Sequence, residues 1–272
     1  MKANEIFSVN TDVTDIEISA VHADVTVIQA QDGAFKVEYP AGKNISVGSS
    51  GDGVILSQGK FPLSRWRAQK ITVHVPSHTV PDVKVHAKCC NLTVQGGIYG
   101  ELSCTLGDGT VRLTDALFSS VEITGDGADV SASGITVKGN FYLQLEKGNV
   151  LAEHTFATRA DCKVKRGNIG LATVSCKECA FNTDRGNITA TVVGNESDYC
   201  TSLITREGTV NREGVQREGA EGSFLAYAEK GNIVLEFAER DVPLPQTDQP
   251  TEGDGNGDGG TVNDRAAAER AL

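Results

Sequence analysis

The chain has 272 residues, with 30 glycines and a single methionine and tryptophan, a composition typical of a turn-rich β protein rather than a helical one. Its formal net charge of −11 excludes general nucleic-acid binding, which needs a basic surface, and disfavours contact with anionic membranes. No segment approaches the roughly 18 apolar residues of a membrane span, and residues 1–19 lack a signal-peptide core, so we expect a cytoplasmic protein without membrane insertion.

Residues 1–80 contain short runs in which apolar and polar residues alternate, among them DIEIS, DVTVI, FKVEY and KITVHVP. Alternation with a period of two predicts β-strands with one apolar face. The intervals between these runs are irregular, so we predict that residues 1–80 form irregular first coils and a cap that covers an exposed strand edge. The insert GKFPLSRWRAQK, residues 59–70, breaks the alternation and is predicted to be a loop.

Residues 81–238 are dominated by a repeat in which a turn such as KGN or RGN is followed by an aliphatic residue. The residue just before the aliphatic one recurs at intervals of 19, 19, 20, 19, 19, 22 and 23 residues. Eight copies in near register indicate a repeat architecture. The eight positions are Asn91, Thr110, Asp129, Asn149, Asn168, Asn187, Thr209 and Asn232.

Apolar and polar residues alternate on both sides of each turn, so a repeat unit reads as strand, turn, strand and a short third segment. About 19 residues at roughly 3.3 Å each give a path of about 60 Å, which suits one coil of a solenoid. We predict an all-β, single-domain parallel β-helix or β-roll with about 19–22 residues per coil, in which residues 81–238 form the regular rungs. The units are not hexapeptides, which are typical of left-handed helices, so we expect a right-handed one.

The repeated turn residues have a structural explanation. Glycine reaches backbone angles that other residues avoid, and asparagine tolerates left-handed geometry and bonds to nearby backbone. Stacked asparagine side chains can also bond from coil to coil. We therefore predict a structural turn ladder, made of Asn149, Asn168, Asn187 and Asn232.

Stacked like charges repel, so acids that precede a basic turn residue, such as Glu146, Asp184 and Glu229, are expected to offset the basic charges. The basic residues themselves are either a binding surface for an acidic polymer or partner, or a solvated, salt-bridged edge that discourages aggregation. We call the five basic turn residues the basic stripe: Lys147, Arg166, Arg185, Arg206 and Lys230.

Seven cysteines without a signal peptide fit reduced thiols in a reducing compartment. Cys176 and Cys179 form a lone CxxC, and Cys162 and Cys200 lie on adjacent units, so a metal or redox site is the alternative to packing. Repeat alignment places Cys162 in the core and Cys179 between Ala160 and Cys200, where cysteine packs as a small hydrophobe. We predict core packing, with no metal and no cofactor.

After Phe237 the sequence becomes rich in Pro, Gly and Asp, and residues 239–272 are predicted to be a disordered acidic tail. Within it, Asp254–Gly259 matches the first half of a calcium-binding loop. Arg265 stands where such a loop requires a bidentate Glu, so no calcium site is predicted.

The stretch ITVHVPSHTVPDVKV, residues 71–85, followed by repeated GNI and GDG turns, resembles the DUF4097-type family of candidate adhesins, which are bacterial β-solenoid proteins of unknown function. The resemblance covers roughly residues 10–238. It implies a β-solenoid and an adhesin-like or cell-envelope-associated protein, and it carries over no catalytic residues.

We predict a non-enzymatic binding or scaffold surface, because solenoids present long regular faces that bind macromolecules. A protein or an acidic polymer is the expected partner, and the oligomeric state stays open. The alternatives are a carbohydrate-active β-helix enzyme of the polysaccharide lyase or hydrolase type, and a regulatory protein of an envelope-stress system. The nearest candidates for catalytic acids are Asp108, Asp126 and Asp129, but they stand in or beside turns, where Asp is common.

Overall fold

The computed structural model of the chain describes residues 4–10, 12–30, 33–41, 44–59 and 68–239. Within these ranges a 16-stranded sheet and one short 3-10 helix, Glu196–Asp198, are present, so the predicted all-β solenoid class is confirmed. The strands are β1 (Asn4–Val9), β2 (Asp15–Ala30), β3 (Phe35–Pro40), β4 (Ile45–Ser50), β5 (Gly53–Gln58), β6 (Gln69–Pro76), β7 (Asp82–Gln95), β8 (Ile98–Thr114), β9 (Leu117–Ser133), β10 (Thr136–Lys147), β11 (Val150–Arg166), β12 (Ile169–Arg185), β13 (Ile188–Val193), β14 (Tyr199–Glu207), β15 (Gly222–Lys230) and β16 (Ile233–Ala238).

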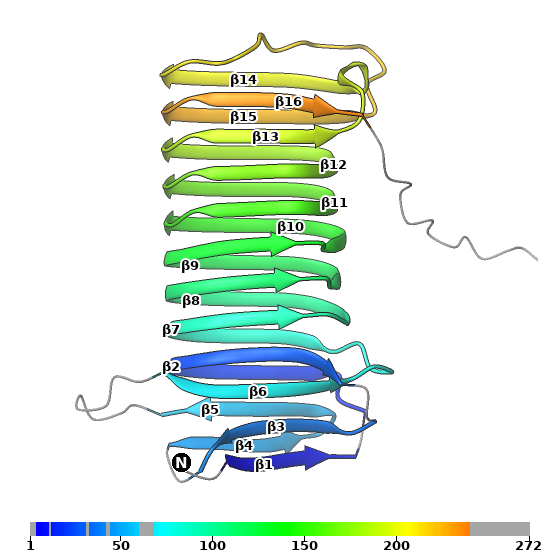
Figure 1. Cartoon of the computed structure of the whole chain (residues 1–272), viewed down its shortest axis with the longest axis vertical. Coiled ribbons are helices and arrows are strands. Elements are labelled where there is room, and N and C mark those ends of the chain that lie inside the picture. Colours follow the sequence, from blue (N-terminus) through cyan, green and yellow to red (C-terminus); the bar gives the residue numbers. More distant parts are fainter. Residues whose placement is uncertain (1–3, 11, 31–32, 42–43, 60–67, 240–272) are drawn as a thin grey trace, which may run out of the picture. The chain divides into compact units, whose positions relative to one another are not determined.

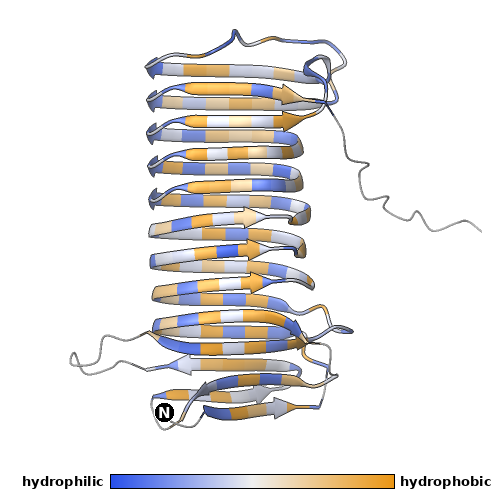
Figure 2. Ribbon diagram, viewed as in Figure 1, coloured by the Kyte–Doolittle hydropathy of each residue, from blue (hydrophilic) through white to orange (hydrophobic). Residues whose placement is uncertain are grey.

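The regular coils are long strands that bend at a corner and pair in parallel with their neighbours (Figure 1). In β8, Leu102, Cys104 and Leu106 point inward before the corner, and Val111 and Leu113 point inward after it. The residues between them are exposed or half-buried, and Figure 2 shows the same alternation along each coil. The period-two pattern of the sequence therefore separates an apolar inner face from a polar outer face.

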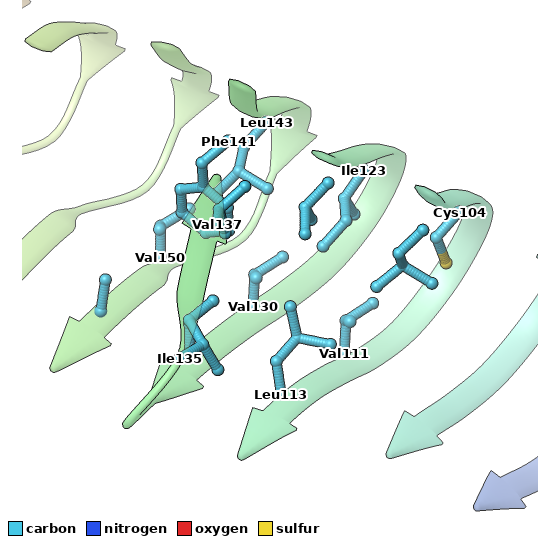
Figure 3. Packing of buried hydrophobic residues seen from close by; sticks show 14 of the residues in the cluster. Cys104, Val111, Leu113, Ile123, Val130, Ile135, Val137, Phe141, Leu143 and Val150 are labelled. Atoms are coloured by element: carbon cyan, nitrogen blue, oxygen red, sulfur yellow. The ribbon is translucent and has the colours of Figure 1, made fainter. Parts of the chain in front are cut away.

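The core consists of columns in which equivalent residues of successive coils stack, because a single coil cannot bury its own apolar face. Bulky and small side chains face each other between coils, with Phe141 beside Ala160 and Phe181 beside Cys162. This alternation fills the interior densely and places Cys162 in the core, as predicted. Figure 3 shows two columns, one formed by Cys104, Ile123 and Leu143 and the other by Val111, Val130 and Val150.

Most corners carry a glycine for a reason that involves the neighbouring coil, although Cys90 and Ala128 stand at the equivalent position of two coils. Gly167 has a φ of +148°, and a Cβ on it would overlap the carbonyl oxygen of Gly148 one coil away. The same overlap recurs between Gly186 and Gly167, and between Gly231 and Gly186. Any other residue would therefore have to adopt a disfavoured φ and also push two coils apart.

The last two coils do not follow the order of the chain. β15 pairs with β12 on one side and with β14 on the other, and β16 pairs with β13. The segment 222–238 is therefore inserted between the coil of β12 and β13 and the strand β14, which precedes it in sequence (Figure 1). The sequential order of rungs expected from the repeat is wrong at this end.

Residues 208–221 cover the strands at this end of the stack. The Thr201 N–H of β14 donates to the Val215 carbonyl oxygen at 2.8 Å. On β16, the Leu235 N–H donates to the Asn211 Oδ1 at 3.0 Å, and the Asn211 Nδ2 donates back to the Leu235 carbonyl, also at 3.0 Å. These contacts satisfy backbone groups that an open edge would expose.

Chain order is also broken at the other end. On one side β2 pairs in parallel with β7, in register from Asp15–Asp82 to Ile28–Gln95. On its other side β2 pairs in parallel with β5 along its first part and with β6 along its last part. β4 then pairs antiparallel with β5, β3 pairs antiparallel with β6, and β1 with β3. The alternating runs of residues 1–80 thus contribute the regular coil of β2, the strands β5 and β6 parallel to it, and three further strands that pair antiparallel.

Three sequence predictions fall largely outside the described residues. They concern most of the loop 59–70, the tail 239–272 and the partial calcium motif within that tail. In the part of the chain that the structure describes, no helix is long and apolar enough to span a membrane.

Candidate functional site

The repeated asparagines form a column of polar side chains on the outer side of one corner. The Asn168 N–H donates to the Asn149 Oδ1 at 3.0 Å, and the Asn187 N–H donates to the Asn168 Oδ1 at 2.9 Å. The next bond runs from the Asn232 N–H to the Asn187 Oδ1, at 2.8 Å. Each corner N–H therefore bonds to a side chain of the neighbouring coil, and the four asparagines of the predicted ladder are brought together.

Residues of other types extend this column at both ends. The Asp129 Oδ1 accepts a hydrogen bond from the Asn149 N–H at 2.7 Å. At the other end, the N–H and the hydroxyl of Thr209 both donate to the Asn232 Oδ1 at 2.9 Å. Asn232 thus lies between Asn187 and Thr209 in the column, whereas in the sequence Thr209 comes before Asn232.

Four residues of the predicted basic stripe lie in register on consecutive coils, and the fifth does not. The prediction for Arg206 is wrong, because Glu207 is the residue of β14 that stands beside Lys230. The Lys230 Nζ lies 3.1 Å from a carboxylate oxygen of Glu207. We call the four residues in register the basic column: Lys147, Arg166, Arg185 and Lys230.

The expected pairing of adjacent acids with the basic stripe occurs only in part, because Glu229 pairs with Arg206 of the stripe but Glu146 pairs with a residue outside it. Glu146 binds Lys165, with 2.5 Å between the carboxylate oxygen and the Nζ, and Glu229 lies 3.6 Å from a guanidinium nitrogen of Arg206. The acids therefore neutralise basic residues outside the column. Three exposed members of the column form no ion pair with any described residue: Lys147, Arg166 and Arg185.

Three unpaired cations in one column make this corner locally positive on a protein with a net charge of −11. Neighbouring strands lie about 4.8 Å apart, and two unit charges at this distance repel by about 1 kcal/mol in bulk water. An anion that bridges two coils would remove this repulsion. The arrangement can therefore bind a series of negative charges along the stack.

A second feature lies on the outer face of β8–β11, where the strand pairing is irregular. Between Val137 and Phe141, β10 has one residue more than the matching part of β9, between Phe118 and Val121. Gly139 stands in this bulge, where a Cβ would lie 2.8 Å from the Ser119 carbonyl oxygen. A bulge of this kind redirects side chains and often lies beside a binding site.

The bulge borders a hollow of about 370 Å³, which we call the bulge groove. Sequence analysis missed it, although the single 20-residue interval in the regular part of the repeat, between Asp129 and Asn149, marks the extra residue. The groove crosses four coils, so no single repeat unit could reveal its composition. Its polar lining residues include Glu101, Glu122, Asn140, Tyr142, Arg159 and Asp161.

The cysteines are partly as predicted. Cys176 and Cys179 are both buried, but they form a disulfide with each other, so the expectation of reduced thiols is wrong for this pair. Cys179 stacks between Ala160 and Phe224, because β15 occupies the place expected for β14. Cys200 is half-buried and its Sγ accepts a hydrogen bond from the Arg217 N–H at 3.3 Å. Among the described residues, no cluster of three or more His, Cys, Asp or Glu could hold a metal ion.

The three candidate catalytic acids are not brought together in one hollow of the described structure. Asp129 belongs to the turn ladder through its bond to Asn149. Asp126 lines a hollow of about 250 Å³ beside the bulge groove, whereas Asp108 lines a separate hollow of about 180 Å³ with Cys89.

Comparison with protein families gives one match, to the family described as Toastrack DUF4097, over residues 8–223. A comparison with curated proteins finds no matching relative.

Solved structures resemble the stacked coils. A candidate adhesin from Bacteroides fragilis is 14% identical, with a TM-score of 0.51 over 88% of this chain and 98% of that one. A candidate lipid-binding protein from Parabacteroides distasonis is 13% identical, with a TM-score of 0.49 over 87% of this chain and 95% of that one. At this identity the first likeness is one of fold.

Proposed function

The chain belongs to the Toastrack DUF4097 family, and from this premise we propose that it is a non-enzymatic, adhesin-like binding protein whose basic column holds an extended acidic polymer. The observation that carries the proposal is the run of exposed, unpaired cations at Lys147, Arg166 and Arg185 on three consecutive coils. Lys230 extends the run by one coil, with its charge shared with Glu207.

The spacing of the column favours a linear partner over a single small anion. Its cations repeat at the strand spacing of about 4.8 Å, and they lie along the stacking direction rather than around a pocket. A linear polyuronate, with one carboxylate on each sugar ring, presents charges along a line in the same way. The net charge of −11 repels such a polymer, so binding would depend on the column and would weaken with salt.

The test is the binding of polygalacturonate by calorimetry to the intact chain and to a triple variant, Lys147→Gln, Arg166→Gln and Arg185→Gln. We expect at least a tenfold loss of affinity in the variant, and weaker binding by the intact chain from about 0.05 M to about 0.5 M salt.

The matched control is the triple variant Lys88→Gln, Lys138→Gln and Lys177→Gln. It changes the net charge equally, but its exposed lysines lie on β7, β10 and β12 and do not form one column. Equal loss of affinity in both triple variants would contradict a role for the column. Binding of poly-L-glutamate in place of polygalacturonate would assign the column to an acidic protein segment.

A carbohydrate-active enzyme is the second candidate, and the bulge groove is the observation that favours it. Carboxylates of Glu122 and Asp161 and the guanidinium of Arg159 line one hollow across neighbouring coils. Hydrolases of this kind need one acid to donate a proton and a second carboxylate to act as a base or nucleophile. If oligosaccharides incubated with the chain are shortened, and Glu122→Gln abolishes the shortening, the non-enzymatic proposal is wrong.

A further inference from the structure

We propose that the bulge groove is a binding site for a neutral oligosaccharide, distinct from the basic column. The groove and the column share no residue. The proposal rests on the shape of the hollow, on the chemistry of its lining and on its charge.

The hollow has the size of a small-ligand site. Its volume of about 370 Å³ lies at the lower end of the range of about 300–1,000 Å³ that is common for ligand pockets. The smaller hollow of about 250 Å³ is lined by Gln144, two residues after Tyr142 and hydrogen-bonded to it, and by Thr105 and Thr124 of the preceding coils. Two adjoining hollows suit successive rings of an oligosaccharide better than one compact metabolite.

Most residues that line the hollow carry a polar side chain, and about half of the lining surface is polar, whereas pockets that bind drug-like molecules are predominantly apolar. A sugar hydroxyl both donates and accepts hydrogen bonds. Carboxylates such as Glu122 accept them, the Arg159 guanidinium donates them, and the Asn140 amide does both. This combination fits a polyhydroxylated ligand.

Tyr142 gives the groove an aromatic surface that is already held in place. It stands in register between Glu122 of β9 and Asp161 of β11. Its hydroxyl donates to the Gln144 Oε1 at 2.6 Å, and the Lys163 Nζ lies 5.6 Å from the ring centroid in a cation–π contact. An aromatic ring with a fixed orientation can pack against the apolar C–H face of a sugar at little entropic cost.

Asp161 supplies an acceptor that the protein leaves unused. Its Oδ2 lies 3.5 Å from the Lys163 Nζ, whereas its Oδ1 is buried without a hydrogen-bond partner among the described residues. Buried polar atoms are nearly always paired, so an unpaired one calls for a specific explanation. This oxygen is closed to solvent, so it would bond to a ligand hydroxyl only after the Asp161 carboxylate turns toward the groove.

The charge of the groove decides between neutral and acidic sugars. Glu101, Glu122 and Asp161 contribute three carboxylates. Against them stand the Arg159 guanidinium, which already lies 3.6 Å from a carboxylate oxygen of Glu178, and the Lys163 Nζ, 3.5 Å from Asp161. This surplus of negative charge repels polyuronates and sulfated glycans, so the groove would select an uncharged chain.

The experiment measures calorimetric binding of four neutral hexasaccharides (cellohexaose, maltohexaose, mannohexaose and xylohexaose) to the intact chain. We expect at least one to bind, and Tyr142→Ala to weaken its binding at least tenfold. The double substitution Tyr142→Phe and Asp161→Asn keeps the shape of the groove but removes the phenol and the carboxylate, and is expected to have an intermediate effect.

Tyr227→Ala is the matched control, because Tyr227 points outward from the same face on β15, in register with Asn182 and Ile204 rather than with groove residues. The proposal is overturned if none of the four hexasaccharides binds, or if Tyr142→Ala and Tyr227→Ala weaken binding equally. The triple variant of the basic column is expected to bind the neutral hexasaccharide with unchanged affinity. The proposal for the groove and the proposal for the column can therefore fail separately.

Discussion

Arg166, Gly167 and Asn168 are neighbours in sequence, but each meets a different constraint at the corner of its coil. Gly167 is required by the backbone, because a side chain there would overlap the carbonyl oxygen of Gly148. Asn168 is required by the adjacent coil, whose N–H at Asn187 bonds to its Oδ1. Arg166 meets neither demand and is exposed, so it is the residue of the three that is free to serve binding.

At this scale we predict that Asn168→Leu lowers the free energy of unfolding by about 1 kcal/mol, because the Asn187 N–H loses its acceptor. Asn168→Asp is the control, since Asp129 already accepts the equivalent bond from Asn149 in the native ladder. Urea unfolding followed by circular dichroism measures both variants. Equal destabilisation by Leu and Asp would show that the accepted hydrogen bond is not what matters at this position.

The order of the strands at the C-terminal end of the stack follows from whether each coil has strands on both faces for its neighbours to pair with. β15 and β16 together form strands on both faces of a coil, and they pair with β12 and β13 respectively. After β14, residues 208–221 form no named strand, and their strand-like pairing is limited to an isolated bridge between Val210 and Ile233. An incomplete coil cannot continue both faces of the stack, so it is stable at the end, where residues 208–221 cover it.

Cross-linking tests this order of elements. Ala180 and Leu225 are partners on β12 and β15, and Leu225 is also the partner of Ser202 on β14. Neighbouring strands lie about 4.8 Å apart, within the Cα separation of a disulfide, whereas strands two coils apart exceed it. We expect Ala180→Cys with Leu225→Cys to cross-link on mild oxidation, and Ala180→Cys with Ser202→Cys not to.

Sequential stacking would favour the other pair, because β14 would then lie directly beside β12 and Ser202 would fall at or next to the position opposite Ala180. Mass spectrometry of digested protein identifies the cross-linked peptides and separates them from those of the native cysteines. Ser202→Cys with Leu225→Cys serves as the positive control, since these two residues are also neighbours.

The stacked core as a whole determines the behaviour of the buried thiols. Burial raises the pKa of Cys90 to about 12, and it also raises the pKa values of Cys104 and Cys162 above their usual range. At a pH at which these thiols would already have lost their protons in the unfolded chain, they are still protonated in the folded chain. Their contribution to stability is therefore complete below the ordinary pKa of 9.0 and is lost as the pH rises above it.

We predict that the free energy of unfolding falls steeply from about pH 9 upward, with each buried thiol contributing up to about 1.4 kcal/mol per pH unit. A variant with Cys90→Ala, Cys104→Ala and Cys162→Ala is expected to be less stable at neutral pH but to show a shallower decline. Urea unfolding between about pH 8 and pH 10.5 measures both slopes. Parallel slopes would mean that other groups cause the alkaline loss of stability.

The sequence by itself determined the architecture of the single coil. Alternating residues such as Leu102, Cys104 and Leu106 specify an inward face, and the Gly–Asn corners specify where each strand bends. It also placed Asn149, Asn168 and Asn187 in one column, because successive members are one coil length of 19 residues apart. These features are local, so every repeat unit encodes them on its own.

Only the tertiary structure decided which coils are neighbours and which side chains of different coils lie close together. Every regular coil offers a similar edge and a similar apolar face, so the repeat cannot distinguish Arg206 from Lys230 as the neighbour of Arg185. The choice depends on which coil completes both faces, which is a property of segments far apart in sequence. The bulge groove likewise joins Glu101 to Asp161 across four coils, and its only local trace is one extra residue in β10.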